Sequence, residues 1–341
     1  MRSHARHVPL LGVACVLGMA CVLGVPKVAR AQTTPPGCAV PAAGGADACR
    51  KAGDLFAFLV PQVGVALAGG NHILGEGGTL GGWGKRIVSV RVSAVDGGIP
   101  TTNVPLAPNR PASADQFGAK RFPMPVPSLD AAVGIWAGIP MPLTNIGGID
   151  LLIGAAGVPG VSSGAFSLKP QGGRSVAYSY GVRLGALQES SFIPGISVSW
   201  LRRAIPKLDF NYTPGNDTLA VNDLSVSTST IRLVASKRFM VFGLAAGVGR
   251  DEVRGESAFS VVVNEPVSGT NTRTAISFPP FDERVTRTTG FVNASFGVAI
   301  LRVVVEYGRS NGEARETLNS FGGRRANESY SYGSLGITTR F

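Results

Sequence analysis

From Trp83 to the C-terminus, apolar residues alternate with small or polar residues along most of the chain. The pattern is clearest over residues 175–187. One face of this segment would carry Val176, Tyr178, Tyr180, Val182, Leu184 and Ala186, and the other Ala177, Ser179, Gly181, Arg183 and Gly185. A period of two indicates a β-strand. Small residues on the second face suit a crowded barrel interior, whereas a soluble sandwich would usually expose Lys, Glu and Thr there.

The same alternation predicts ten strands joined by connections that alternate in length. The strands are 85–97, 127–139, 148–156, 174–187, 194–203, 219–235, 239–253, 284–299, 301–311 and 328–341. Long connections at 98–126, 157–173, 204–218, 254–283 and 312–327 are interleaved with short ones at 140–147, 188–193, 236–238 and about 300. Outer-membrane barrels have short periplasmic turns and long outer loops. A hairpin within 254–283 either extends above the membrane or joins the wall, so ten strands is the prediction and twelve the alternative.

The last predicted strand ends the chain on an aromatic residue. Gly333, Leu335, Ile337, Thr339 and Phe341 share one face. This strand resembles the C-terminal strand of bacterial outer-membrane β-barrel proteins, in which alternating apolar residues and a final aromatic are recognised by the barrel assembly machinery. The resemblance implies an all-β fold, a transmembrane antiparallel up-and-down β-barrel, in the bacterial outer membrane. It also implies outer-membrane lipid and the barrel assembly machinery as partners, with Leu335, Ile337 and Phe341 as the assembly signal.

The N-terminus has the features of a cleaved signal peptide. Basic residues precede an apolar stretch over 8–25, and Ala-Arg-Ala at 29–31 has the small-x-small pattern that signal peptidase reads. We therefore predict export and removal of residues 1–31. In an oxidising compartment, Cys38 and Cys49 are candidates for a disulfide, with two unrelated free thiols as the alternative.

The segment between the leader and the first strand differs from the rest of the chain. Residues 47–59 could form a short amphipathic helix that Pro61 ends, and half of the residues in 69–84 are glycine. A segment ahead of the first wall strand begins in the periplasm, so we expect it to lie under the barrel or insert as a plug. The Gly69-Gly70-Asn71 region is faintly similar to the N-terminal hatch of the long-chain fatty-acid transporter family. The predicted organisation is a signal peptide at 1–31, a periplasmic plug-like segment at 32–82 and a barrel at 83–341.

Composition and charge exclude several other classes of protein. Charged residues make up 16% and hydrophobic residues 44% of the chain, and no second long apolar run follows the N-terminus. These values exclude a helical-bundle membrane protein and a disordered chain. The net charge of +11 does not indicate nucleic-acid binding, because the basic residues are scattered among strands instead of forming one stripe.

Two motifs suggest chemistry but lack their context. Gly-Val-Ser162-Ser-Gly matches the G-x-S-x-G pattern, yet no helical periodicity follows it, as a nucleophile elbow requires. Residues 77–85 suggest a phosphate loop, but Thr79 and Arg86 stand where glycine and Ser or Thr are needed. Beyond the predicted leader, His72 is the single histidine, and we expect it on the periplasmic side. We therefore predict no catalytic residue, no metal, no cofactor and no enzymatic activity.

If the apolar face of each strand meets lipid, a set of charged side chains lies inside the barrel. These lumen candidates are Arg91, Asp130, Asp150, Arg183, Arg232, Arg302 and Glu306. On the lipid face each arginine would cost about 2–4 kcal/mol. The charges either pair across a filled interior or form an electropositive constriction that attracts anionic solutes.

Two functions follow from these alternatives. The first is passive passage of small or amphipathic solutes across the outer membrane, with a small-molecule solute as the partner. The second is a closed structural or surface-interaction barrel that acts through its outer loops, chiefly 98–126 and 254–283.

Overall fold

Ten strands form a closed antiparallel ring in the computed structural model, which describes residues 38, 45–101, 104, 111–158, 160–163, 166–173, 176–213, 218–267 and 270–341. The ring strands are β1 (Arg86–Pro100), β3 (Ala119–Trp136), β6 (Ile149–Gly157), β9 (Val176–Leu187), β10 (Gly195–Ala204), β12 (Thr218–Phe239), β13 (Phe242–Val267), β14 (Thr270–Val298), β15 (Leu301–Asn311) and β17 (Tyr330–Arg340). Each pairs with the next along the chain, and β17 pairs with β1 to close the ring. The predicted fold class and the ten strands are confirmed.

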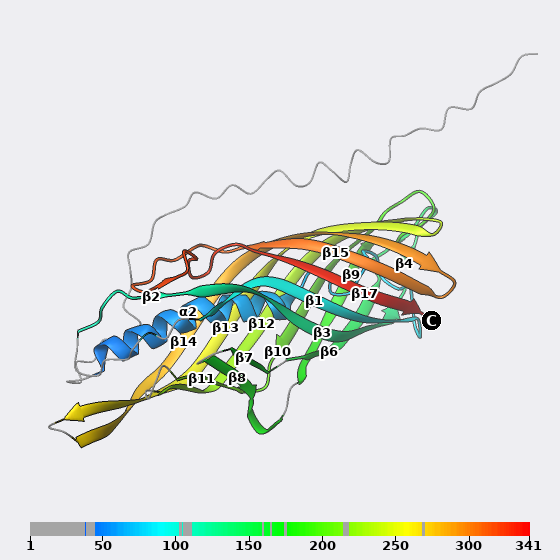
Figure 1. Ribbon diagram of the computed structural model, residues 1–341. Coiled ribbons are helices and arrows are strands. Elements are labelled where there is room, and N and C mark those ends of the chain that lie inside the picture. The colour runs from blue at the N-terminus through cyan, green and yellow to red at the C-terminus, as the bar shows by residue number, and fades with distance from the viewer. Residues whose placement is uncertain are drawn as a thin grey trace, which may run out of the picture.

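The two ends of the ring differ in their connections. At one end, which also holds the C-terminus, β12 is joined to β13 and β14 to β15 by turns of two residues (Figure 1). Met240 and Ala299 adopt the left-handed region in these turns, with φ of 50° and 53°. The first of them lies at 240–241 and not at the predicted 236–238, because β12 continues to Phe239. We call this the short-turn end and the opposite one the long-loop end.

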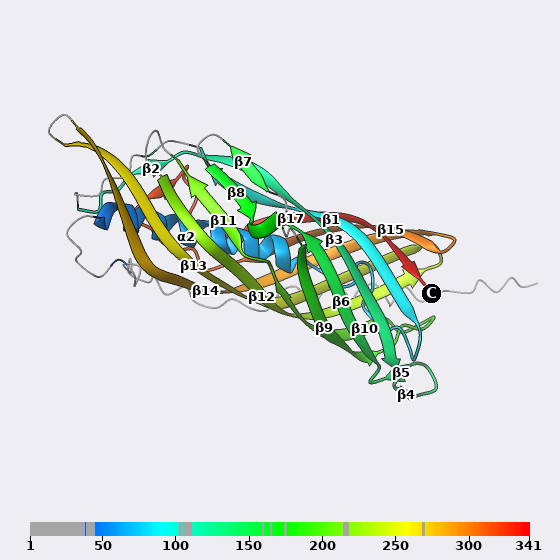
Figure 2. The ribbon, with the colours of Figure 1, turned by 90° about the horizontal axis from the view of Figure 1, so that it is seen from below.

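Smaller elements extend the ring at both ends. These are β2 (Gln116–Phe117), β4 (Ile139–Pro140), β5 (Asn145–Ile146), β7 (Val161–Ser163), β8 (Phe166–Pro170), β11 (Leu208–Tyr212), β16 (Ser320–Phe321) and a 3-10 turn at Gln171–Gly173. Toward the long-loop end, β12 runs past β10 and pairs with β11, which pairs in turn with β8. β4 and β5 form a hairpin at the short-turn end (Figure 2).

Three ring strands are much longer than a membrane crossing requires. β12 has 22 residues, β13 has 26 and β14 has 29, whereas a tilted transmembrane strand needs about 9–11. β13 and β14 stay paired through the predicted loop 254–283 and project beyond the other strands at the long-loop end (Figure 1). The hairpin in this loop is therefore a continuation of two wall strands and adds none to the ring.

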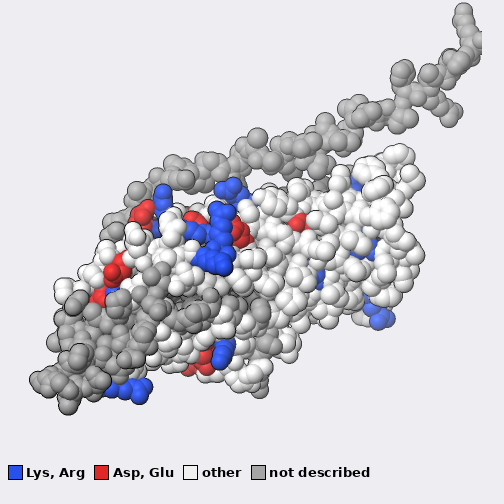
Figure 3. Space-filling model, viewed as in Figure 1, with Lys and Arg blue, Asp and Glu red and all other residues white. Residues whose placement is uncertain are grey.

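The two faces of β13 exchange their chemistry along the strand. From Phe242 to Val248, on the short-turn side of Asp251, the exposed outward side chains are apolar, namely Phe242, Leu244 and Val248. On the other side, charged Arg254 and Glu256 face outward while Val253, Phe259 and Val261 are buried inside. In the face seen in Figure 3, charged side chains likewise gather over the long-loop half. The outer surface therefore meets lipid over the short-turn half and water over the long-loop half.

A 23-residue helix, α2 (Ala46–Ala68), lies inside the ring (Figure 2). Near its start, Asp47 accepts a hydrogen bond from Ser113 and Lys51 pairs with Asp115, both in the long connection after β1, so the helix begins at the long-loop end. The chain then descends through the ring to Arg86 at the short-turn end, where Arg86 and Phe341 exchange backbone hydrogen bonds. Residues 45–82 therefore lie inside the ring as a plug and not under the barrel, the other of the two expected positions.

The predicted helix 47–59 is too short. α2 continues past Pro61 to Ala68, and Pro61 is buried within it. Proline in a helix interior usually kinks or ends the helix, because it lacks an N–H and crowds the preceding turn. Here the surrounding barrel holds the helix on both sides of Pro61. By length and composition α2 is long and apolar enough to cross a membrane, yet 83% of the 18-residue stretch that meets this criterion is buried inside the barrel.

Around α2 the barrel interior is an apolar core. Phe58 stacks on Phe321 with ring centroids 4.4 Å apart, and Phe56 and Phe281 contact Phe259 at centroid distances of 5.6 and 4.4 Å. All five rings are at most 6% exposed. The predicted disulfide between Cys38 and Cys49 is present and joins the start of α2 to the preceding chain. We use the name apolar core for this long-loop half of the interior.

Candidate functional site

The short-turn half of the interior is polar and is filled by residues 69–82. We call it the polar bore. Alternation along the wall strands turns arginine, aspartate, serine and glycine inward, and the glycine-rich segment can pass close to them because glycine carries no side chain. At Gly77, for example, an added Cβ would lie 2.5 Å from the backbone nitrogen of Ser236. A larger residue at this position would force the segment away from the wall.

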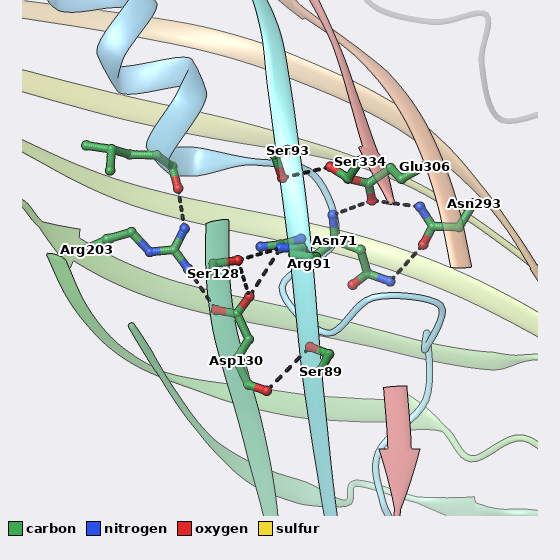
Figure 4. Close-up of polar contacts among 11 residues, drawn as sticks. Asn71, Ser89, Arg91, Ser93, Ser128, Asp130, Arg203, Asn293, Glu306 and Ser334 are labelled. Carbon is green, nitrogen blue, oxygen red and sulfur yellow. Dashed lines mark hydrogen bonds and ion pairs between the residues drawn. The ribbon is translucent and has the colours of Figure 1, made fainter. Parts of the chain in front are cut away.

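One cluster of the polar bore joins three wall strands to the end of α2 (Figure 4). Asp130 on β3 accepts contacts from Arg91 Nε at 3.1 Å and from Arg203 Nη2 at 2.9 Å. Arg91 Nη1 also donates to the Asn71 carbonyl at 2.7 Å, and Arg203 Nη1 donates to the Leu67 carbonyl. Both guanidinium groups therefore bridge a wall carboxylate and the internal segment.

A second cluster fixes Asn71 from the opposite wall (Figure 4). Glu306 Oε2 accepts from the Asn71 backbone N–H at 2.9 Å and from Asn293 Nδ2 at 2.6 Å. Ser334 donates to the other oxygen of Glu306 at 3.4 Å. The carboxylate thus acts as an anchor for the backbone of the internal segment.

Two further ion pairs contact the same segment. Arg232 pairs with Asp251 and donates to the carbonyls of Gly70 at 3.1 Å and Gly69 at 3.0 Å. Arg183 donates to Asp150 at 2.7 Å, and the oxygens of Asp150 accept the Leu80 backbone N–H at 3.1 and 3.2 Å. Each pair joins two neighbouring wall strands, and one member of it, Arg232 or Asp150, also bonds to the segment.

The structure turns all seven lumen candidates to the inner face. Six are at most 3% exposed, namely Arg91, Asp130, Asp150, Arg183, Arg232 and Glu306. The seventh, Arg302, is half-buried near the short-turn end and donates to Ser295 at 3.0 Å. The assembly-signal residues Leu335, Ile337 and Phe341 face outward and are 59%, 50% and 69% exposed. Their recognition by the assembly machinery stays a prediction.

Several interior residues were absent from the prediction. Arg203 and Asp251 continue the inward parity of strands that were predicted, so extending the alternation to the strand ends would have found them. Arg287 is also buried; it donates to Ser310 and lies over the ring of Tyr330 at 4.9 Å. It lies in the predicted strand 284–299, opposite Asp251, where Thr286 and Thr288 replace apolar residues on the outward face and the alternation is harder to follow.

His72 is the clearest misplacement. It lies in the polar bore, where its two ring nitrogens are 2.9 Å from the Ser199 hydroxyl and 2.6 Å from the Thr230 hydroxyl. The expected position on the periplasmic side is wrong, because the segment that carries it enters the ring. Over the described ranges, no three His, Cys, Asp or Glu side chains come together as a metal site would require.

A closed ring with an apolar outer belt and a charged interior defines the class of the protein. It is a transmembrane β-barrel of the bacterial outer membrane, as the resemblance of its C-terminal strand implied. The signal peptide at 1–31 lies outside the described residues and stays a prediction. The similarity to the long-chain fatty-acid transporter family also stays a prediction.

No family model and no curated protein sequence matches the chain. Among solved structures, it is similar to the translocator domain of autotransporter NalP from Neisseria meningitidis, at 11% identity and a TM-score of 0.39, over 76% of this chain and 89% of that one. The outer membrane protease OmpT from Escherichia coli matches at 10% identity and 0.36, over 75% and 96%. Ail of Yersinia pestis matches at 8% and 0.20, over 76% and 99%. The class therefore rests on the ring and the face chemistry of this chain.

The prediction of no enzymatic activity is corrected by two findings. An outer membrane protease is among the similar structures, so the barrel fold does not exclude catalysis. The argument from histidine also fails, because His72 lies inside the barrel beside Ser199. At 10% identity the likeness to the protease does not show that this chain has such an activity.

Proposed function

We propose that this protein is a closed outer-membrane barrel that acts through the surface of its long-loop end. The observation that carries the proposal is the occupation of the polar bore by residues 69–82. Arg91, Arg183 and Arg232 are at most 2% exposed. All three pair with wall carboxylates, and Arg91 and Arg232 also donate to the internal segment, so almost none of their surface is accessible to a solute while that segment is in place.

The architecture of the long-loop end supports a role as a binding surface. Lys51 of α2 pairs with Asp115 at 2.7 Å, and Asp54 accepts the backbone N–H of Asn319 at 2.9 Å. The helix thereby holds two of the long connections from inside. A surface that is already ordered loses less conformational entropy on binding than mobile loops do.

Closure is tested by conductance. The mature protein, folded and inserted into planar lipid bilayers, should give no stable current steps at low voltage, because residues 69–82 block the bore. Reproducible steps from the unmodified protein would overturn the proposal. A blank with detergent alone and a known open porin serve as the two controls.

The surface role is tested by shortening the outer hairpin. Replacing residues 260–277 by Asn-Gly keeps Phe259 and Phe278, which are cross-strand partners, next to a two-residue turn. Cells that display this variant should no longer adhere to the surfaces to which cells that display the parent adhere. The variant barrel should keep its heat-modifiable electrophoretic mobility. A matched deletion of 141–144, in the β4–β5 hairpin at the other end, should retain binding. Equal retention of all three forms would contradict the proposal.

Passage of solutes is the second candidate, favoured by how residues 69–82 are held. In the polar bore the contacts are hydrogen bonds and ion pairs, so displacement of the segment would expose polar surface that water can solvate. Asp130→Asn combined with Glu306→Gln weakens the two clusters that hold Asn71, since Asp130 positions Arg91 and Glu306 accepts the Asn71 N–H. If the segment moves under load, this variant should give voltage-dependent steps that the parent lacks, and silence in both would oppose passage.

A further inference from the structure

A cavity of about 290 Å³ opens at the short-turn end, between residues 69–82 and the wall. Its charged lining is Arg238 from β12, Arg302 from β15, Arg340 from β17 and Glu76 from the internal segment. Thr338 and the turn at 299–301 also line the cavity. Three guanidinium groups and one carboxylate give this cavity an excess of positive charge.

Arg302 and Arg340 differ from the arginines of the polar bore, whereas Arg238 has carboxylate partners as they do. Arg238 lies 3.5 Å from Glu76 and 3.3 Å from Glu189. Arg302 donates to the Ser295 hydroxyl at 3.0 Å, and Arg340 donates to the Leu80 carbonyl at 2.7 Å. Neither Arg302 nor Arg340 has a carboxylate within 4.0 Å in the described part of the chain. Each retains guanidinium N–H donors beyond the one that is used.

The wall around Arg302 is shaped to receive its side chain. An added Cβ at Gly243 would lie 3.1 Å from Nη1 of Arg302, and one at Gly297 would lie 3.2 Å from Nη2. Gly297 is also the cross-strand partner of Arg302. Two glycines thus provide the room in which the guanidinium lies across the wall.

We propose that this cavity is a binding site for a phosphate group. The guanidinium fork matches the tetrahedral anion, and charge-assisted hydrogen bonds to phosphate are among the strongest that side chains form. The bound group is either free phosphate or the phosphate of an anionic lipid, because Ile300 and Leu301 on the adjoining turn are 69% and 50% exposed on the outer surface. Glu76 opposes binding, since it is the one carboxylate in the lining.

Titration calorimetry on the folded protein in zwitterionic micelles tests the site, with sodium phosphate as the probe and sodium chloride at equal ionic strength as the blank. Arg302→Gln and Arg340→Gln should each weaken phosphate binding about tenfold, because each removes a charged donor. Glu76→Gln should tighten it. Arg309→Gln is the matched control, since Arg309 lies exposed at the far end of β15 and bonds to Asn311.

A second titration separates the two sources of phosphate. Dihexanoyl phosphatidylglycerol is compared with dihexanoyl phosphatidylcholine. Binding of free phosphate that falls in both arginine variants supports a soluble ligand. Binding of phosphatidylglycerol alone, with the same loss, supports a lipid headgroup. Failure of both probes, or equal weakening by Arg309→Gln, overturns the site. If Arg302→Gln does not fold, Arg302→Lys keeps the charge and should still weaken binding by removing the fork.

Discussion

The apolar core and the polar bore are two halves of one barrel interior, filled by one continuous segment of chain. In the core, α2 packs against aromatic and aliphatic side chains, whereas in the bore residues 69–82 meet ion pairs and hydroxyl groups. The inward face of β13 lines both halves. Asp251 belongs to the polar bore, and Val253, two residues further along, belongs to the apolar core. The difference follows from the medium outside the wall. Where lipid surrounds the barrel, apolar side chains face out; where water surrounds it, they face in.

The largest effect should come from breaking an ion pair in the polar bore. Arg232→Met leaves Asp251, which is 1% exposed, without its guanidinium partner. A buried charge without a partner costs about 3–5 kcal/mol. Guanidinium chloride unfolding in lipid vesicles measures the loss. The double variant Arg232→Met, Asp251→Leu should recover most of it, and a single variant within about 1 kcal/mol of the parent would mean that water reaches this site.

The corresponding test of the apolar core is to create a cavity in its packing. Leu55→Ala removes a side chain that is 2% exposed, at a cost of about 2–5 kcal/mol. We expect the helical circular dichroism signal to melt earlier while the β-sheet signal is retained, because the polar bore does not depend on this packing. Leu143→Ala, at a position 66% exposed, is the control. Simultaneous melting of both signals would show that the two halves unfold as one unit.

The position of the lipid boundary can be tested on the outer face. Val305→Arg places a charge on the lipid-facing side of β15, at a position 54% exposed, and should cost about 2–4 kcal/mol at mid-membrane. Arg284→Val changes an exposed residue on the long-loop side, where the loss of its ion pair with Glu252 should cost less than about 1 kcal/mol. Folding free energies in vesicles compare the two. Similar costs would contradict the boundary near Asp251.

The smallest effect concerns pH and the apolar core. Burial raises the pKa of the Asp54 carboxyl above its ordinary 3.8, against the opposing hydrogen bonds from Asn319 and the charge of Arg50. The stability linked to this group is therefore fully present below about pH 3.8 and is lost as the pH rises through the raised pKa. Asp54→Asn removes this titration. The melting temperature should therefore fall less between acidic and neutral pH in the variant than in the parent. An unchanged difference would contradict the sign.

Much of the wall could be predicted because membrane strands repeat one local pattern. The ten strands and the outward faces of residues 176–186 and 301–307 follow from alternation alone, since each position must face either lipid or the interior. The seven lumen candidates came from the same rule. The rule fails where the surroundings change. Inward Arg287 was missed where Thr286 and Thr288 replace apolar residues on the outward face of β14. Helix 47–59 was ended at Pro61 because local propensity takes no account of a surrounding barrel.

The sequence by itself determined the period of the wall, the sidedness of its connections and the pair of cysteines that form the disulfide. These depend on neighbours along the chain or on the choice between lipid and interior. Only the tertiary structure decided that residues 45–82 lie inside the ring, that Arg232 pairs with Asp251, and that Arg302 and Arg340 face a cavity without carboxylate partners. Those contacts join segments far apart in the chain, so they depend on how the ring closes around its internal segment, which local pattern does not encode.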